Sequence, residues 1–121
     1  MHHAAQAYGA VAKQIASPRD LEASLLLKAA SRLQAVHDGW DTQRTVLDEA
    51  LRFNRRLWTL FLNTVTNADN PLPVEIRQNI ANLGIFVINQ TMSIAVKPER
   101  ERLPSLISIN REVAAGLRAG R

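Results

Sequence analysis

The sequence predicts an all-α fold, a single-domain bundle of about five helices. Apolar residues recur every three or four positions in five segments, and no segment shows the alternating pattern of a strand. Proline and glycine separate these segments. A chain of 121 residues has the length of one domain. We expect one domain over residues 1–121, with residues 1–4 and 118–121 frayed.

Two helices are expected before residue 40. The first runs from about Ala4 to Ile15. Its apolar face is formed by Ala4, Tyr8, Val11, Ala12 and Ile15. The second starts at Ser17-Pro18-Arg19-Asp20, where Ser17 can cap, Pro18 suits the first position and Asp20 can complete a reciprocal cap. It reaches about His37, because Asp38-Gly39 stops it.

The third helix is expected to be the longest, from Asp41 or Thr42 to Asn67. Trp58 falls within its main apolar arc, so core packing is the leading explanation and a partner anchor the other. Phe53 and Leu60 form a second, smaller apolar strip beside the arginine face. Either they cover a neighbouring helix, which is favoured, or they leave an exposed patch.

The fourth helix, from Pro73 to about Val96, follows the turn Asp69-Asn70-Pro71-Leu72-Pro73. It carries two apolar stripes on roughly opposite sides, a pattern typical of a helix sandwiched between neighbours. The stretch from Gln78 to Val96 has no charged residue, but its five amides would need partners inside a membrane. A buried helix of a soluble bundle is therefore expected.

Pro98 and Pro104 bracket a charged connector, where a break or kink is predicted. The last helix is expected from Pro104 or Ser105 to Leu117. Asn110 lies in the middle of its apolar stripe, where an unsatisfied amide costs free energy. We expect Asn110 to bond a loop carbonyl such as one in the Asp69–Pro73 turn.

The residues that chemistry needs are missing, so a non-enzymatic protein is expected. There is no cysteine, no glycine-rich phosphate loop and no Ser/His/Asp pattern around His37. His2 and His3 could hold Cu(II) or Ni(II) at a free amino terminus, but a disordered polar end is favoured. We expect no metal, no cofactor and no small-molecule substrate.

A set of side chains beside the apolar stripes suits contact with another protein. The predicted partner-binding residues are Arg52, Phe53, Arg55, Arg56, Leu60, Gln78, Asn82 and Asn89. The alternative for the arginines, which is favoured, is a solvated face that pairs with Asp48 or Glu49 at helical spacing. For the amides, the alternative is ordinary hydration.

The net charge of +4 comes mostly from arginine, which binds carboxylate or phosphate in a bidentate manner. Acidic proteins and RNA both stay open as partners. The charge is spread out and only 5% of residues are aromatic, which argues against stacking on bases. The start of the chain has no signal-peptide pattern, so a cytoplasmic protein without membrane contact is expected.

Five segments of the chain stand out together by their order and spacing, namely Ser17–Glu22, Asn54–Thr59, Asp69–Pro73, Gln78–Gly84 and Leu106–Leu117. Taken in order, they resemble the FlaF family of flagellar biosynthesis regulators, and the similarity extends from about Tyr8 to Leu117. Pro104 departs from the pattern expected before the last of these. The residues assigned to structural motifs are Trp58, Asp69, Asn70, Pro71, Pro73, Asn110 and Arg111.

The resemblance implies a small cytoplasmic helical protein needed for flagellin production and filament assembly. It implies a chaperone-like regulator that binds flagellin, the translational regulator FlbT, or both, and affects flagellin message indirectly. The alternative is an RNA-binding regulator that contacts flagellin message directly.

Overall fold

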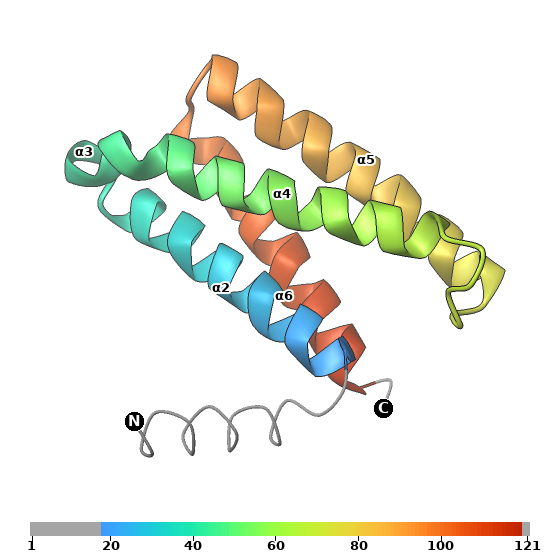
Figure 1. Cartoon of the computed structure of the whole chain (residues 1–121). Coiled ribbons are helices and arrows are strands. Elements are labelled where there is room, and N and C mark those ends of the chain that lie inside the picture. Colours follow the sequence, from blue (N-terminus) through green and yellow to red (C-terminus); the bar gives the residue numbers. More distant parts are fainter. Residues whose placement is uncertain (1–17, 120–121) are drawn as a thin grey trace, which may run out of the picture.

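The computed structural model describes residues 18–119, which form an all-α bundle of four long helices with no strand among them (Figure 1). The predicted all-α fold is confirmed. The expected helix from Ala4 to Ile15 lies outside the described residues, as does the proposed cap at Ser17. The elements are α2 (Pro18–Asp38), α3 (Trp40–Gln43), the 3₁₀ turn η1 (Arg44–Val46), α4 (Leu47–Thr66), α5 (Val74–Val96), the 3₁₀ turn η2 (Arg100–Arg102) and α6 (Leu103–Ala119).

The long helix expected from Asp41 or Thr42 begins only at Leu47, so that boundary was wrong. A corner precedes it, because the Gly39 carbonyl accepts hydrogen bonds from the backbone N–H groups of Thr42 at 2.9 Å and Gln43 at 2.6 Å. The β-branched pair Thr45-Val46 follows and lowers the helix propensity of this stretch.

The predicted break between Pro98 and Pro104 is confirmed. Helix α5 ends at Val96, the turn η2 follows, and α6 starts at Leu103, with Pro104 in its first turn. Proline fits there because the first residues of a helix need no N–H partner inside it.

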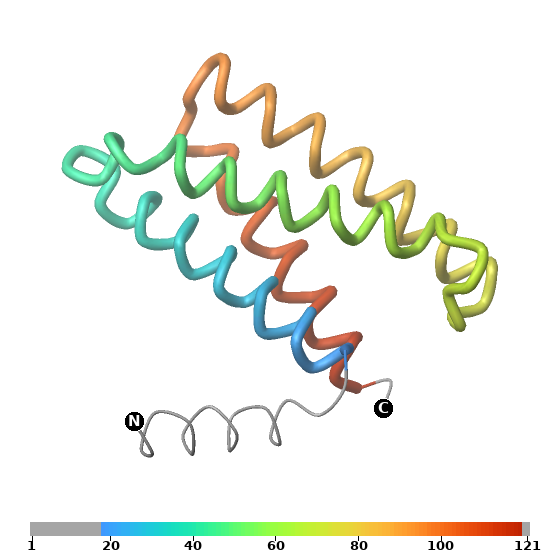
Figure 2. Tube along the Cα trace, in the orientation of Figure 1, coloured from blue at the N-terminus to red at the C-terminus, as the bar shows by residue number. Residues whose placement is uncertain are grey.

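The helices pack as two antiparallel pairs, α2 with α6 and α4 with α5, joined by the contact of α2 with α4 (Figures 1 and 2). Helix α5 therefore lies at the outer edge against α4, and the expectation that it is sandwiched was wrong. Its buried positions form a single face, namely Ala81, Gly84, Val87, Thr91 and Ile94. Gly84 faces α4, where a Cβ atom would lie 3.5 Å from the Trp58 ring, an ordinary packing distance.

Trp58 is the largest side chain with no exposed surface, and it lies at the centre of the core. Its ring meets that of Phe61 edge to face, with 5.6 Å between the centroids. The leading explanation for Trp58, core packing, therefore holds. The other fully buried large apolar side chains are Leu26, Leu33, Val36, Val87, Ile94, Leu103 and Leu106.

A chain of hydrogen bonds runs through this core and connects three helices. The indole Nε1 of Trp58 donates to Oδ1 of Asn110 at 2.9 Å, and Nδ2 of Asn110 donates to Oδ1 of Asn54 at 2.7 Å. Nδ2 of Asn54 then donates to Oγ1 of Thr91 at 3.3 Å, and that hydroxyl donates to the Val87 carbonyl at 2.6 Å. All four polar side chains are buried, and within the described residues no buried side-chain N or O atom lacks a partner.

The expected bond from Asn110 to a carbonyl of the Asp69–Pro73 turn was wrong. Its partners are the side chains of Trp58 and Asn54, 52 and 56 positions away in the sequence. An amide satisfied on both its oxygen and its nitrogen costs little to bury, because each bond replaces one lost to water.

Asn110→Ala should lower the free energy of unfolding by about 2–4 kcal/mol, since it leaves the Trp58 N–H and Oδ1 of Asn54 buried without a partner. Urea unfolding followed by far-UV circular dichroism measures the change. The control is Ser108→Ala, an exposed position on the same helix, which should change stability by less than about 0.5 kcal/mol. Equal midpoints for the Asn110 variant and the parent would contradict the role of the network.

Candidate protein-binding surface

Helix α5 leaves one long apolar side uncovered. Along it, Val74 is 69%, Ile85 50%, Met92 48% and Val96 87% exposed. Spacings of eleven, seven and four residues put these side chains on one side of the helix. No charged residue occurs from Gln78 to Val96. Exposed apolar side chains that share one side of a helix mark an interaction site more often than ordinary surface does.

Two arginines of α4 border this strip. A shallow groove of about 200 Å³ lies between α4 and α5. One side is lined by Asp48, Leu51, Arg52 and Arg55, and the other by Thr91, Met92 and Ala95. We call Arg52, Arg55, Ile85, Met92 and Val96 the α4–α5 face. The pattern predicted Arg52 and Arg55 but missed the three apolar members. The second apolar stripe of α5, which includes Ile85 and Met92, pointed to this surface, but it was interpreted as packed against a neighbouring helix.

The three predicted arginines do not share one surface. Arg52, Arg55 and Arg56 are all exposed, but Arg56 does not line the α4–α5 groove. In residues 18–119, none of the three forms an ion pair with Asp48 or Glu49. Arg52 and Arg55 therefore present their guanidinium groups beside an apolar strip, which suits a partner that carries carboxylates.

Phe53 and Leu60 do not form a common strip. Phe53 is half-buried and packs on α2, where the Arg32 guanidinium lies 4.5 Å and the Lys28 ammonium 5.7 Å from its ring centroid. It covers a neighbouring helix, the favoured alternative. Leu60 is 62% exposed. Their role as partner contacts stays a prediction.

The predicted amide residues Gln78, Asn82 and Asn89 are all exposed on α5. Gln78 Nε2 donates a hydrogen bond to Asn82 Oδ1 at 3.0 Å, so each of these two amides already has one hydrogen-bond partner within the helix. Asn89 lies one turn before Met92, close to the α4–α5 face.

The turn from Asn67 to Pro73 is held by its own amides. Asn67 Oδ1 accepts from the Asp69 N–H, and Asn70 Oδ1 accepts from the Leu72 N–H, both at 2.9 Å. Asn70 Nδ2 also donates to the Thr64 carbonyl at 3.1 Å. Pro73 is the N-cap of α5 rather than its first residue. Asn70 thus ties the link between α4 and α5 to the end of α4, whereas Asp69, Pro71 and Pro73 are exposed.

Beside this turn lies an apolar groove of about 320 Å³, which we call the end groove. It is formed where the start of α2, the end of α4, the turn and the end of α6 meet. Its apolar lining includes Phe61, Val65, Leu72, Ile80, Val113 and Leu117. Glu22 lies at the rim of the groove and is partly buried. This burial raises the pKa of its carboxyl, and the nearby Arg19 charge partly offsets the rise.

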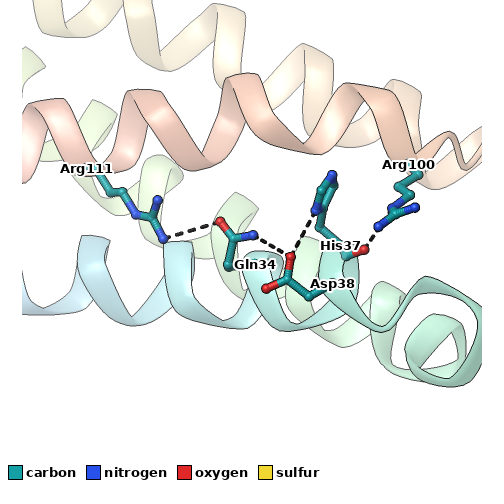
Figure 3. Close-up of polar contacts among 5 residues, drawn as sticks. All are labelled: Gln34, His37, Asp38, Arg100 and Arg111. Atoms are coloured by element: carbon teal, nitrogen blue, oxygen red, sulfur yellow. Dashed lines mark hydrogen bonds and ion pairs between the residues drawn. The ribbon is translucent and has the colours of Figure 1, made fainter.

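A row of polar contacts connects α2 to α6 on another side of the bundle (Figure 3). Arg111 Nη2 donates to Gln34 Oε1 at 3.4 Å, and Arg100 Nε donates to the His37 carbonyl at 2.9 Å, which caps the end of α2. Hydrogen bonds from His37 and Gln34 hold the pKa of Asp38 below its ordinary value. These contacts support a structural role for Arg111.

The described residues contain no group of three or more His, Asp or Glu side chains that could hold a metal. Among the helices of the described residues, α5 alone is long and apolar enough to cross a membrane. Only 28% of its most apolar stretch is buried inside the protein. The expectation of a buried helix was therefore wrong for most of its surface. The described surfaces of the bundle offer apolar side chains, amides and arginines, groups that also occur in protein–protein interfaces.

The described residues thus form a small all-α bundle whose outer helix carries an uncharged, partly exposed apolar face bordered by arginines. The model of the FlaF family, flagellar protein FlaF, matches residues 4–117 of the chain, and the protein belongs to this family. It is a flagellar protein. No curated protein and no solved structure matches the chain.

Glu22→Gln should stabilise the protein near neutral pH but not in acid. Burial raises the pKa of Glu22 in the folded state, so the folded protein favours the neutral carboxyl. As the pH rises through that pKa, the carboxyl becomes charged and the protein loses stability. Below the ordinary value of 4.5 both states carry the neutral carboxyl, so the variant and the parent should melt alike. Melting temperatures measured across this pH range test the sign, with exposed Glu112→Gln as the control. A destabilised variant at neutral pH would contradict the prediction.

Proposed function

We propose that this protein regulates flagellum biogenesis without enzymatic activity, by binding flagellin, FlbT or both in the cytoplasm. The exposed α4–α5 face is the observation that carries the proposal. In the chaperone-like form of this role, the protein supports flagellin production and filament assembly by holding a partner polypeptide. Its effect on flagellin message is then indirect.

The shape of the face suits an amphipathic helix laid along α5. Helix α5 has 23 residues, which gives an axis of about 34 Å. Recognition of a helix in a groove uses apolar anchors at helical spacing, and Ile85, Met92 and Val96 provide them. Flagellin terminal segments, which are amphipathic helices, are the occupants that we propose for this face.

Burial of the strip supplies the affinity. Each of these side chains has already lost part of its contact with water, so its gain on binding is a fraction of the about 1.5–3 kcal/mol for full burial of an apolar side chain. The exposed amides argue against lipid as the alternative cover, because Gln78, Asn82 and Asn89 would each need a hydrogen-bond partner in hydrocarbon.

Arg52 and Arg55 add direction to this contact. They border the apolar strip on one side only, so a partner helix with carboxylates along one flank is favoured in one rotation about its axis. Such rim charges act mainly on specificity and association rate.

Direct RNA binding is the second candidate, and the same exposed arginines favour it. Neither tryptophan offers a free ring for stacking on bases, since Trp58 is buried and the Arg44 guanidinium lies 5.2 Å from the centre of the Trp40 ring; Phe86, 47% exposed, is the aromatic side chain in residues 18–119 that remains open to solvent. A titration of the message leader against salt separates the candidates, because phosphate contacts weaken steeply as salt rises.

Met92→Glu should weaken the complex with flagellin or FlbT at least about tenfold, because it places a charge in the centre of the apolar strip. Calorimetric titration with each purified partner measures the dissociation constant. Leu60→Glu makes the same change at an exposed apolar position of α4 outside the groove and should leave the affinity within about threefold.

Thermal melting of both variants must match the parent. Loss of binding by Leu60→Glu alone would move the interface to the other side of α4. If the parent protein binds neither partner, the proposed function is wrong.

Arg55→Glu should weaken the same complex several-fold and reduce its dependence on salt, since Arg55 lines the groove. Arg56→Glu is the matched control, one residue away with the same charge change and outside the groove. Association rates measured at low and high salt distinguish the two variants. Equal effects would assign the arginines to general attraction rather than to this face.

A further inference from the structure

The groove between α4 and α5 carries charges of both signs. Asp48, Arg52 and Arg55 of α4 line it, and all three are exposed. Asp48 and Arg55 are seven positions apart, so they lie on the same side of the helix and about 10.5 Å apart along its axis. Within residues 18–119 neither of them forms an ion pair. A partner that places an arginine opposite Asp48 and a carboxylate opposite Arg55 would therefore match this groove.

A second copy of this chain offers the two charges at the required spacing. The midpoint between Asp48 and Arg55 lies just after Leu51. A two-fold axis through this point, perpendicular to α4, brings two copies of the helix together antiparallel. Asp48 of one copy then lies opposite Arg55 of the other, and the symmetry forms the same pair a second time.

The apolar half of the groove fits the same axis. The hydrogen bond from Asn54 to Thr91 sets the level of α5 relative to α4, and the two helices run antiparallel (Figure 2). The axis therefore crosses α5 between Met92 and Ala95. Met92 of one copy meets Ala95 of the other, a long side chain against a small one, as close packing requires. Because α5 carries no charge from Gln78 to Val96, this half of the contact adds no repulsion.

We propose that the groove between α4 and α5 is a self-association surface, on which a second copy of this chain lies antiparallel and pairs Asp48 with Arg55 across a two-fold axis. The dimer is weak and reversible, because the groove is shallow and Arg52, next to the axis, lies near its own copy. Since the contact covers Arg55 and Met92, self-association competes with any other partner of the α4–α5 face. Self-association is a property of the protein alone and does not depend on the proposed function.

A charge swap tests the pairing in the full-length protein. Sedimentation velocity at concentrations up to about 1 mM measures the dissociation constant of the parent dimer. Asp48→Arg and Arg55→Asp should each weaken self-association about tenfold or more, because each places like charges opposite one another twice. An equimolar mixture of the two variants should associate, since each supplies the charge that the other lacks. Both variants keep a net positive charge, because each changes the +4 of the chain by two units, so general attraction does not explain their association.

Glu49→Arg and Arg56→Asp are the matched controls. They make the same charge changes at exposed neighbouring positions outside the groove and should leave self-association within about threefold of the parent. Far-UV circular dichroism should show all four variants folded, since none of the positions is buried.

A parent protein that stays monomeric up to about 1 mM would overturn the inference. Swap variants that dimerise like the parent, or that stay monomeric when mixed, would overturn it as well. The titrations with flagellin and FlbT are separate measurements, so a failure of self-association leaves the proposed function as it stands.

Discussion

The hydrogen-bonded chain from Trp58 through Asn110 and Asn54 to Thr91 sets the geometry of the bundle. Apolar contacts alone tolerate a slide of one helix along another, since one hydrocarbon surface resembles the next. Buried amides do not, because a shift of one turn, about 5.4 Å, would leave several polar groups without partners at once. Helices α4, α5 and α6 are thus held in one register.

The same register places the exposed residues proposed to contact a partner. Asn54 precedes Arg55, and Thr91 precedes Met92, so the internal contact between Asn54 and Thr91 lies directly beneath the α4–α5 face. A change in the interior would therefore move Arg55 relative to Met92. A site held by side chains with fixed partners loses less conformational entropy when it binds.

The positions of the helices could be predicted from the sequence better than the packing of each helix against the others. Proline positions indicated the starts of α2 and α5 and the break before α6, because proline acts through local backbone geometry, whereas the start of α4 at Leu47 was missed. The partners of Asn110 were missed because they lie more than fifty positions away, and nothing local points to them. The exposure of Ile85 and Met92 was missed for a related reason: the period of a helix reveals its apolar sides but not which side has a neighbour. Arg52 and Arg55 were identified, yet only the structure separates them from Arg56.

The position of α5 at the edge of the bundle has a consequence for the life of the protein in the cell. Helix α5 packs mainly against α4, so fewer contacts must break when it opens locally. We therefore expect its amide hydrogens to exchange, and proteases to cleave it, before the other helices of the bundle. Its uncovered hydrocarbon also favours self-association at high concentration. A polypeptide bound along α5 would oppose both processes by mass action. The abundance of this protein would then follow the supply of whatever covers that helix, and surplus copies would be the first to be degraded.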